Sequence, residues 1–389
     1  MSKSKKSVSP ENPWNRYCLY PEKLVQGNRV DILLGGSEAY PEMLRAIEDA
    51  REWILMEVYI LSDDATGMEF SEALKAASRR GVEVRLVWDS IGCIENSADF
   101  FDSVRDAGIK LYEFHPVAPW RPRWGWNTRL HRKILIVDGK VAFTGGLNIA
   151  TEYDAVEKGG AGWRDTHLRL EGPSVREIGK IALRMWQWYA GERLSQQRFL
   201  PITGDSGDVL ASVLTNQRRR HRRRIRRAYT RAISRANRYV YITNAYFVPD
   251  IGTRRALRNA SRRGVDVRVI VPAHSDIPVV ALAGKRLYSR MLRWGIRIYE
   301  WQKQVLHAKT AVVDGVWSTV GSFNLDHRSV FHNIELNVSC VSDEIGKKME
   351  DIFFTDLENC SEIHFEEWRR RPLTQKMLEK ICYQFHYWL

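Results

Sequence analysis

The sequence of 389 residues contains an internal repeat, which constrains its fold more than any other feature. Three segments of the first half return in the same order in the second half: 78–87 as 261–270, 107–114 as 294–301, and 130–148 as 306–324. The first pair reads SRRGVEVRLV and SRRGVDVRVI. Because matches in a fixed order indicate duplication, we expect two similar units of roughly 180 residues each.

Each unit shows the pattern of an α/β fold. Apolar strand patterns at 53–60, 82–89, 239–247 and 265–272 alternate with helical patterns at 40–50, 67–80, 226–236 and 253–263. Such alternation predicts mixed sheets flanked by helices. The weakly patterned residues 200–208 mark a junction between the units. The predicted organisation is an N-terminal extension (1–28), a first unit (29–203), a second unit (204–365) and a C-terminal amphipathic tail (366–389).

The same polar residues recur in both units in the pattern H-x-K-x4-D followed by G-x-x-N. They are His131, Lys133, Asp138, Gly145 and Asn148, repeated as His307, Lys309, Asp314, Gly321 and Asn324. In a strand, side chains at i and i+2 point to one face, so each histidine is expected beside its lysine. One copy alone fits a solvated strand face equally well, but two copies at equal spacing favour a catalytic site.

These residues suit chemistry on a phosphodiester. The two lysines, together with Asn148 and Asn324, can neutralise and hold the non-bridging oxygens during attack. Histidine is a competent nucleophile and, near neutral pH, a competent acid. If the two units pack face to face, one histidine attacks phosphorus while the other protonates the departing alkoxide. An incoming alcohol then reverses these roles.

With these motifs the chain resembles the phospholipase D superfamily, whose mark is two H-x-K-x4-D motifs in one chain. Within it the sequence is most similar to the bacterial cardiolipin synthases, through GGLN (145–148), GSFNLDHRS (321–329) and NIELN (333–337). The usual G-S pair is G-G in the first motif, a departure common in these synthases. The resemblance implies two similar α/β units related by a pseudo-twofold axis, with the active site between them.

The resemblance also implies the reaction: transfer of a phosphatidyl group from a phospholipid donor to phosphatidylglycerol through a covalent phosphohistidine, with no metal or cofactor. It makes His131 the nucleophile and His307 the acid/base, although the residues themselves also permit the reverse. The five cysteines are scattered and show no metal-ligand spacing. The donor, phosphatidylglycerol or phosphatidylethanolamine, is not distinguished by the sequence.

Other functions remain open at this stage. A phospholipase D, another phosphodiesterase or a nuclease would use the same two-histidine chemistry, and hydrolysis or phosphatidylserine synthesis differs only in the acceptor. A non-catalytic membrane scaffold is disfavoured, because a dead copy should have lost at least one motif histidine or lysine. The sequence therefore predicts a phosphatidyltransferase of the cardiolipin synthase type, with hydrolase or nuclease as the alternative.

Four acidic residues accompany the motifs. By the resemblance, a carboxylate downstream of each motif asparagine holds an imidazole nitrogen, and the matching residues are Asp165 and Glu335. An ordinary charge at a strand edge is the alternative for both. Asp138 and Asp314 precede glycine at strand ends, where a turn-forming or lysine-holding role is favoured over direct chemistry.

Two basic segments are candidates for binding anionic groups. WRPRWGWNTR (120–129) runs into His131, which makes Arg121, Arg123 and Arg129 candidates for substrate binding, unless the tryptophans pack over the loop. The arginine-rich stretch 218–227 fits either headgroup binding or a solvated helix face.

The charge and the C-terminal pattern indicate a partner. A net charge of +13 favours an anionic one, and no run of about 18 apolar residues is present to span a bilayer. The segment 373–389 places eight apolar residues on one half of a helical wheel, namely Leu373, Met377, Leu378, Ile381, Cys382, Phe385, Trp388 and Leu389. This fits an in-plane membrane anchor or a helix docked on the core.

The expected partners follow from these features. We expect an anionic phospholipid membrane and phospholipid substrates, with the protein peripheral on the cytoplasmic face of a bacterial cell membrane. Nucleic acid is allowed by the charge but disfavoured, because a nuclease does not need the apolar stripe. No oligomer is required, because the duplicated chain supplies both half-sites.

Overall fold

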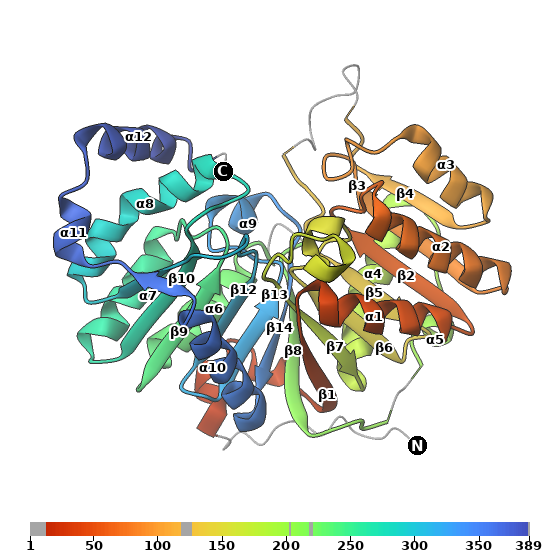
Figure 1. Ribbon diagram of the computed structural model, residues 1–389. Helices are drawn as coiled ribbons and strands as arrows, with labels where there is room; N and C mark the ends of the chain where they lie inside the picture. Colours follow the sequence, from red (N-terminus) through yellow and green to blue (C-terminus); the bar gives the residue numbers. More distant parts are fainter. Residues whose placement is uncertain (1–12, 118–126, 202–203, 218–220, 388–389) are drawn as a thin grey trace. The chain divides into compact units, whose positions relative to one another are not determined.

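The computed structural model describes residues 13–117, 127–201, 204–217 and 221–387, and it divides into two compact units (Figure 1). We name each unit after its motif histidine. The His131 unit contains Val25–Val209 and the short segment Asn333–Leu336. The His307 unit contains the described residues of Leu210–His332 and Asn337–Leu389, with residues 13–24 from the N-terminal region.

The His131 unit is a mixed sheet with helices on both faces. Its strands are β1 (Val25–Leu34), β2 (Trp53–Val58), β3 (Glu83–Asp89), β4 (Lys110–Phe114), β5 (Ile134–Val137), β6 (Val141–Gly145) and β7 (Thr166–Glu171). Its α-helices are α1 (Gly35–Glu48), α2 (Ala65–Arg79), α3 (Ala98–Asp106), α4 (Pro173–Tyr189) and α5 (Gln196–Phe199), with short 3-10 turns η3 (Thr151–Tyr153) and η4 (Val156–Lys158). The strand order is β1-β7-β6-β5-β2-β3-β4, in which β2, β3 and β4 are parallel neighbours.

Alternate residues of one strand serve the two faces of this sheet. Leu86 on β3 packs into the cluster that contains residues of α1, α2 and α3. Its neighbour Val87 packs with Met185 and Trp186 of α4 on the opposite face. The period of two along β3 therefore explains why its apolar run is continuous.

The His307 unit has the same plan with additional elements at both ends. Its strands are β8 (Val209–Thr215), β9 (Tyr239–Asn244), β10 (Asp266–Pro272), β11 (Arg297–Trp301), β12 (Lys309–Val313), β13 (Trp317–Gly321), β14 (Leu336–Val341) and β15 (Cys360–Glu362). Its helices are η1 (Pro13–Tyr17), η2 (Pro21–Lys23), α6 (Arg224–Arg235), α7 (Ile251–Arg262), α8 (Pro278–Arg293), α9 (His327–Phe331), α10 (Asp343–Leu357), α11 (Phe365–Arg369) and α12 (Leu373–Gln384). The strand order is β8-β14-β13-β12-β9-β10-β11-β15.

The strand orders show that the sequence repeat is a structural repeat. Strands β1, β7, β6, β5, β2, β3 and β4 of one unit correspond in order to β8, β14, β13, β12, β9, β10 and β11 of the other. The predicted α/β class, with a mixed sheet flanked by helices in each unit, is confirmed.

The sequence SRRGV, which occurs in both units, has a local structural role. In SRRGV, the helices α2 and α7 end just before Gly81 and Gly264, whose φ angles of 90° and 86° lie in the left-handed region. Glycine adopts that conformation without a Cβ penalty, so it ends each helix and turns the chain into the next strand. The serine of each copy then donates to a backbone carbonyl, Ser78 to Ala107 at 2.7 Å and Ser261 to Trp294 at 2.6 Å.

Within the part of the chain that the structure describes, no helix has both the length and the apolar character needed to cross a bilayer.

Candidate active site

His131 is oriented by a carboxylate that lies far away in the sequence. The segment Asn333–Leu336 runs beside the residues before His131: the His131 amide donates to the Ile334 carbonyl at 3.0 Å, and the Ile334 amide donates to the Arg129 carbonyl at 2.8 Å. This pairing brings Glu335 to the imidazole, where Nδ1 lies 3.1 Å from both Oε1 and Oε2. With Nδ1–H donating to the carboxylate, Nε2 is the nitrogen that keeps its lone pair for chemistry.

Burial strengthens this arrangement. The side chain of His131 is 10% exposed, whereas that of Glu335 is not exposed at all. Asn333 donates from Nδ2 to Glu335 Oε1 at 3.2 Å, which gives the carboxylate a second fixed partner. Because the carboxylate is buried and held, the imidazole ring has one defined orientation.

Each motif lysine donates to the backbone carbonyl of its own motif histidine. The Lys133 ammonium donates to the backbone carbonyl of His131 at 2.8 Å and lies 5.0 Å from the ring centre of Tyr59. The Tyr59 ring also meets the His131 ring edge-on, with centroids 5.0 Å apart. The His–Lys–Tyr group is therefore compact, because the ammonium and the imidazole both contact the Tyr59 ring.

The His307 unit contains the matching group. Lys309 donates to the backbone carbonyl of its own histidine, His307. The ring of Tyr246 lies 6.1 Å from the His307 ring and 6.0 Å from the Lys309 ammonium. His307 and Lys309 are both buried. The two units thus share the local geometry of the motif as well as its sequence.

The strand positions of the motifs differ from the expectation. His131 and Lys133 were predicted within a strand, but β5 begins only at Ile134. In the His307 unit, β12 begins at Lys309, directly after Ala308. The motif histidines therefore precede their strands. At these positions the backbone has not yet entered the strand ladder, so other contacts must hold the side chains.

The motif asparagines hold the turn that follows the neighbouring strand. Asn148 Oδ1 accepts from the Ile60 amide at 3.3 Å, and its Nδ2 donates to the Tyr153 hydroxyl at 2.8 Å. In the other unit, Asn324 Oδ1 accepts from the Tyr246 amide at 3.4 Å. Both asparagines are buried, so each ties its G-x-x-N turn to the end of β2 or β9.

The motif aspartates bind backbone amides. Asp138 accepts from the amides of residues 51–53 at 2.9–3.0 Å, and Asp314 accepts from those of residues 237–239 at 2.8–2.9 Å. Asp314 also accepts from the Tyr17 hydroxyl at 2.7 Å. Both residues have positive φ angles, 52° and 54°. Each carboxylate therefore fixes the loop leading into β2 or β9, at the end of the strand away from the motif histidine.

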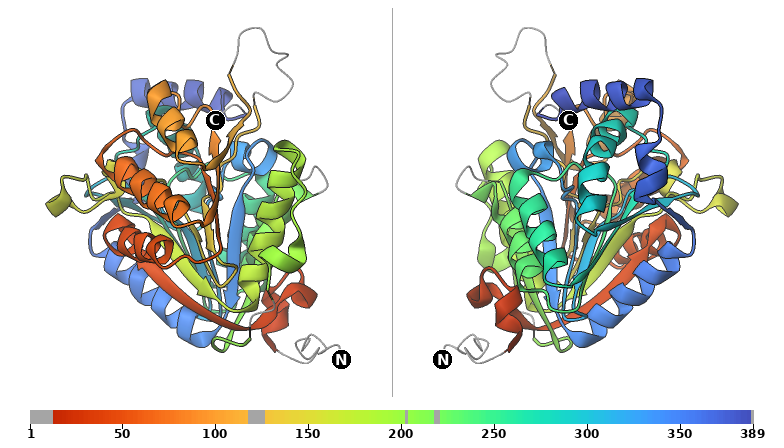
Figure 2. Two further views of the ribbon diagram at one scale, coloured as in Figure 1. Left: turned by 90° about the vertical axis from the view of Figure 1, so that its right-hand side faces the viewer. Right: turned by 90° about the vertical axis from the view of Figure 1, so that its left-hand side faces the viewer.

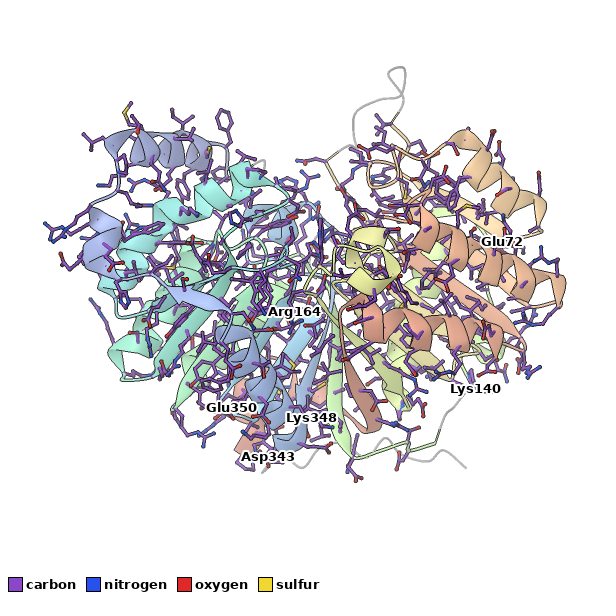
Figure 3. All side chains as sticks on the ribbon, in the orientation of Figure 1. Glu72, Lys140, Arg164, Asp343, Lys348 and Glu350 are labelled. Carbon is purple, nitrogen blue, oxygen red and sulfur yellow. The ribbon has the colours of Figure 1, made fainter. Side chains whose placement is uncertain are left out.

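Asp165 directly precedes β7 in the His131 unit, and its carboxylate lies against Gly146, the second glycine of the G-G pair in the first motif. Its buried carboxylate accepts from the Thr166 amide at 2.7 Å, and Arg164, labelled in Figure 3, donates to the Asp165 carbonyl at 2.5 Å. A Cβ on Gly146 would lie only 2.1 Å from Asp165 Oδ1. A larger residue at position 146 would therefore require the Asp165 carboxylate to move.

A buried histidine lies close to this carboxylate. Burial lowers the pKa of His167 to about 4, with Asp165 opposing the shift and Lys133 adding to it. Its Nδ1 has no hydrogen-bond partner among the described residues. His167 is therefore neutral at physiological pH and adds no charge beside Lys133.

Two buried ion pairs next to His131 were missed by the sequence reading. Arg132, between the motif histidine and lysine, pairs through Nε and Nη2 with Glu57 of β2, and both side chains are fully buried. Burial raises the pKa of the Glu57 carboxyl, and Arg132 opposes that rise. A glutamate inside the apolar run WILMEVYI was the signal, because a buried carboxylate requires a cation.

The second pair joins Asp89 at the end of β3 to Arg129, with Nη1 and Oδ1 3.4 Å apart. Asp89 Oδ2 also accepts from the Leu130 amide at 2.8 Å. Arg129 is only 1% exposed, so this contact favours a structural role over the substrate binding predicted for it. The other two predicted substrate-binding residues, Arg121 and Arg123, lie outside the described residues.

Comparison with known proteins identifies the family. The family model described as "Cardiolipin synthase, PLD-like domain" matches residues 43–154 and 229–357, one segment in each half of the chain. The chain is 33% identical over 353 residues to a cardiolipin synthase of Geobacillus kaustophilus, covering 90% of this chain and 70% of that protein. It is also 33% identical to cardiolipin synthase A of Pseudomonas putida, covering 91% of this chain and 74% of that protein.

The chain belongs to the cardiolipin synthase family of phospholipase D-like proteins. The predicted superfamily is confirmed, and the chain is an enzyme of the phosphatidyltransferase class. Among solved structures, phosphatidylserine synthase of Haemophilus influenzae matches with a TM-score of 0.68 at 11% identity over 92% of each chain. Polyphosphate kinase of Porphyromonas gingivalis matches with a TM-score of 0.59 at 15% identity, over 87% of this chain and 49% of that one. These two structures show the fold.

Proposed function

We propose that the enzyme makes cardiolipin by moving a phosphatidyl group from a phospholipid donor to phosphatidylglycerol through a phosphatidyl-histidine on His131. The contact between His131 Nδ1 and the buried Glu335 carboxylate carries this proposal. A carboxylate that accepts from Nδ1–H leaves Nε2 unprotonated and stabilises the positive charge that the ring gains when it attacks phosphorus.

The first half-reaction forms the intermediate. His131 Nε2 attacks the phosphorus of the donor lipid, and the bond from phosphorus to the headgroup oxygen breaks. His307 gives a proton to the departing alkoxide, so the headgroup leaves as a neutral alcohol. Lys133 and Lys309, with the amide groups of Asn148 and Asn324, stabilise the charge on the non-bridging oxygens. The roles of these residues and of Asp165, as the carboxylate for His307, are part of the proposal.

The second half-reaction is the reverse of the first, with a different alcohol as the attacking group. A glycerol hydroxyl of phosphatidylglycerol gives its proton to His307 and attacks the phosphorus. The phosphorus–nitrogen bond breaks, and His131 regains its lone pair while cardiolipin is released. Transfer prevails over hydrolysis only if water is kept from the intermediate while the lipid alcohol is bound. The buried positions of both motif histidines support this requirement.

The partners follow from the substrates. Both lipids belong to a bilayer, so we propose that the enzyme binds an anionic phospholipid membrane as a peripheral protein on the cytoplasmic face of a bacterial cell. The net charge of +13 favours such a surface. Because each unit supplies one motif, one chain is sufficient for the proposed chemistry.

The test is an assay of lipid products. Purified wild type and His131→Ala are incubated with vesicles of phosphatidylglycerol and phosphatidylethanolamine, and the products are read by mass spectrometry. His364→Ala, at an exposed histidine, is the matched control. We expect cardiolipin from wild type and the control but not from His131→Ala. Phosphatidic acid as the main product would replace the transferase by a hydrolase, and cleavage of single-stranded DNA without lipid products would make the enzyme a nuclease.

A further inference from the structure

Helix α12 carries its apolar side chains on the outside of the protein. It packs against α8 in the His307 unit (Figure 2). Five large apolar residues nevertheless point away from this contact and are 47–76% exposed: Leu373, Met377, Leu378, Ile381 and Phe385. They recur at helical spacing and form one continuous stripe. The sequence pattern placed Cys382 with them, but the structure buries Cys382 on the inner face.

The inner face of α12 contains a buried ion pair as well as Cys382. Glu379 is 1% exposed, and its carboxylate pairs with Arg371 at 2.5 Å. Burial raises the pKa of the Glu379 carboxyl, and Arg371 opposes that rise. A helix docked for apolar burial alone would show the reverse orientation, with its leucines inside. The outward stripe is therefore not explained by packing within the unit.

Within residues 368–387 the outward charge is entirely positive. Glu379 is the only acidic residue between Trp368 and Tyr387, and it is turned inward. The basic residues of the same stretch are Arg369, Arg370, Arg371, Lys376 and Lys380. Arg370 and Lys380 are exposed. An apolar stripe flanked by cations, with no outward anion, is the pattern of helices that lie in the interface of an anionic bilayer.

Helix α10 of the same unit shows an ordinary solvated face. The outward side of α10 carries Asp343 and Lys348, both labelled in Figure 3, together with Glu344 and Lys347. Lys348 pairs with Glu344 at 2.7 Å. The face of α10 thus has mixed charge and no apolar stripe. The outward face of α12 therefore differs from that of α10 in both its charge and its apolar content.

We propose that α12 is a membrane-docking helix, whose outward stripe enters the headgroup region of an anionic bilayer while Lys380 and Arg370 contact lipid phosphates. This inference rests on the proposed function, because it gives the protein a reason to meet a bilayer. A second copy of the chain is a poorer occupant. A twelve-residue helix is about 18 Å long and about 10 Å wide, far less than the roughly 800 Å² that each partner gives to a standard protein interface.

The proposal is tested by vesicle binding, which does not depend on activity. Wild type, Ile381→Glu and Ile381→Leu are sedimented with vesicles of phosphatidylglycerol and phosphatidylcholine in equal parts, and with vesicles of phosphatidylcholine alone. Ile251→Glu is the matched control, because Ile251 is 59% exposed and Ile381 is 54% exposed in helices of the same unit. We expect Ile381→Glu to bind the anionic vesicles at least about tenfold more weakly. Ile381→Leu and Ile251→Glu should bind like wild type, and wild type should prefer the anionic vesicles.

A second measurement separates docking from catalysis. Turnover of a short-chain, monomeric phosphatidylglycerol should be equal in Ile381→Glu and wild type, whereas turnover of vesicle lipid should fall with binding. If wild type does not turn over the short-chain lipid, the proposed function is wrong, whereas the result of the vesicle-binding experiment still stands. Equal vesicle binding by Ile381→Glu and wild type would overturn the docking helix. So would a dimer in sedimentation velocity that Ile381→Glu dissociates without loss of vesicle binding.

Discussion

In the His131 unit, the residue between the motif histidine and lysine is Arg132, which forms a buried ion pair with Glu57 of β2. In the His307 unit, the matching positions hold Ala308 and Thr243, because Ile134 faces Glu57 as Thr310 faces Thr243. Ala308 and Thr243 are equally buried but uncharged. One copy of the repeat has therefore placed two charges where the other has none.

The second ion pair follows the same rule. Asp89 at the end of β3 corresponds to Pro272 at the end of β10, since each faces the last residue of the next strand. Its partner Arg129 corresponds to Val305, one residue before the matched leucines of the repeat. Both ion pairs beside His131 are thus absent at the matching positions beside His307.

The difference shows what the motif itself requires. The contact of lysine with the histidine carbonyl is present in both units, so it does not depend on the ion pairs. In the His307 unit, Lys309 is already part of the ladder and faces Asn244 of β9. In the His131 unit the ladder starts one residue later, at Ile134. We infer that the ion pairs hold the segment 129–133 where the ladder does not reach it.

The largest effect is expected at the carboxylate that orients His131. Glu335→Gln keeps the shape of the side chain but removes the charge that favours Nδ1–H, so transferase activity should fall on the order of 10³-fold. Thermal unfolding should change little by comparison. Glu344→Gln, at an exposed site, is the control. A wild-type kcat in Glu335→Gln would show that the Glu335 charge is not needed to orient His131.

The next effect concerns the buried ion pair. Glu57→Gln leaves the Arg132 charge buried without its carboxylate, which should lower the free energy of unfolding by about 3–5 kcal/mol. The double variant Glu57→Thr with Arg132→Ala installs the residues of the other unit and should recover most of that loss. Urea unfolding of the three proteins measures both changes. A double variant no more stable than the single one would break the correspondence drawn between the units.

A smaller and shared effect is expected at the motif aspartates. Asp138→Asn and Asp314→Asn each weaken charge-assisted bonds to three backbone amides and should each cost about 1–3 kcal/mol of unfolding free energy. Asparagine tolerates the positive φ, so backbone strain does not add to the cost. Asp314 also holds Tyr17, and its variant should lose about 1 kcal/mol more. Urea midpoints that rank the two in the opposite order would contradict this reading.

The smallest effect is a pH dependence at a position where only the His131 unit has a histidine. Since the pKa of His167 is about 4 in the folded protein and near 6.5 in the unfolded chain, the unfolded state binds the proton more tightly. Stability is therefore complete above about pH 6.5 and should fall by about 1 kcal/mol on acidification from pH 8 to pH 6. The matching residue, Asn337, does not titrate. Burial also lowers the pKa of His332 in the His307 unit to about 4, so His167→Asn should reduce the loss of stability between pH 8 and pH 6 without abolishing it. An unchanged profile would exclude His167 as a contributor.

The repeat allowed much of the fold to be predicted from sequence. The helix predicted at 253–263 is α7 (Ile251–Arg262), and the strand predicted at 82–89 is β3 (Glu83–Asp89). Periodicity predicts such elements well because each buries one face against its own unit. Element ends were less accurate, as at α1, predicted to begin at 40 but beginning at Gly35.

The contacts of the site were harder to predict. Both His131 and Glu335 were predicted as site residues, but their pairing was not. It depends on the short segment Asn333–Leu336, which comes from the second half of the sequence but belongs to the His131 unit. No local pattern reports which buried charges meet, so the partners of Glu57 and Asp89 were not foreseen. For α12, the pattern gave amphipathicity without direction, because the wheel cannot show that Glu379 faces inward.

The most direct test of the account is to isolate the covalent intermediate. Wild type and His307→Asn are mixed with phosphatidylglycerol, quenched within the first turnover, digested and analysed by mass spectrometry for phosphatidyl-histidine. The proposed mechanism predicts a phosphatidyl adduct on the peptide that contains His131. The amount of adduct should be larger in His307→Asn if resolution of the intermediate slows more than its formation. An adduct on His307 in the wild type, or cardiolipin formed with His131→Ala, would contradict it.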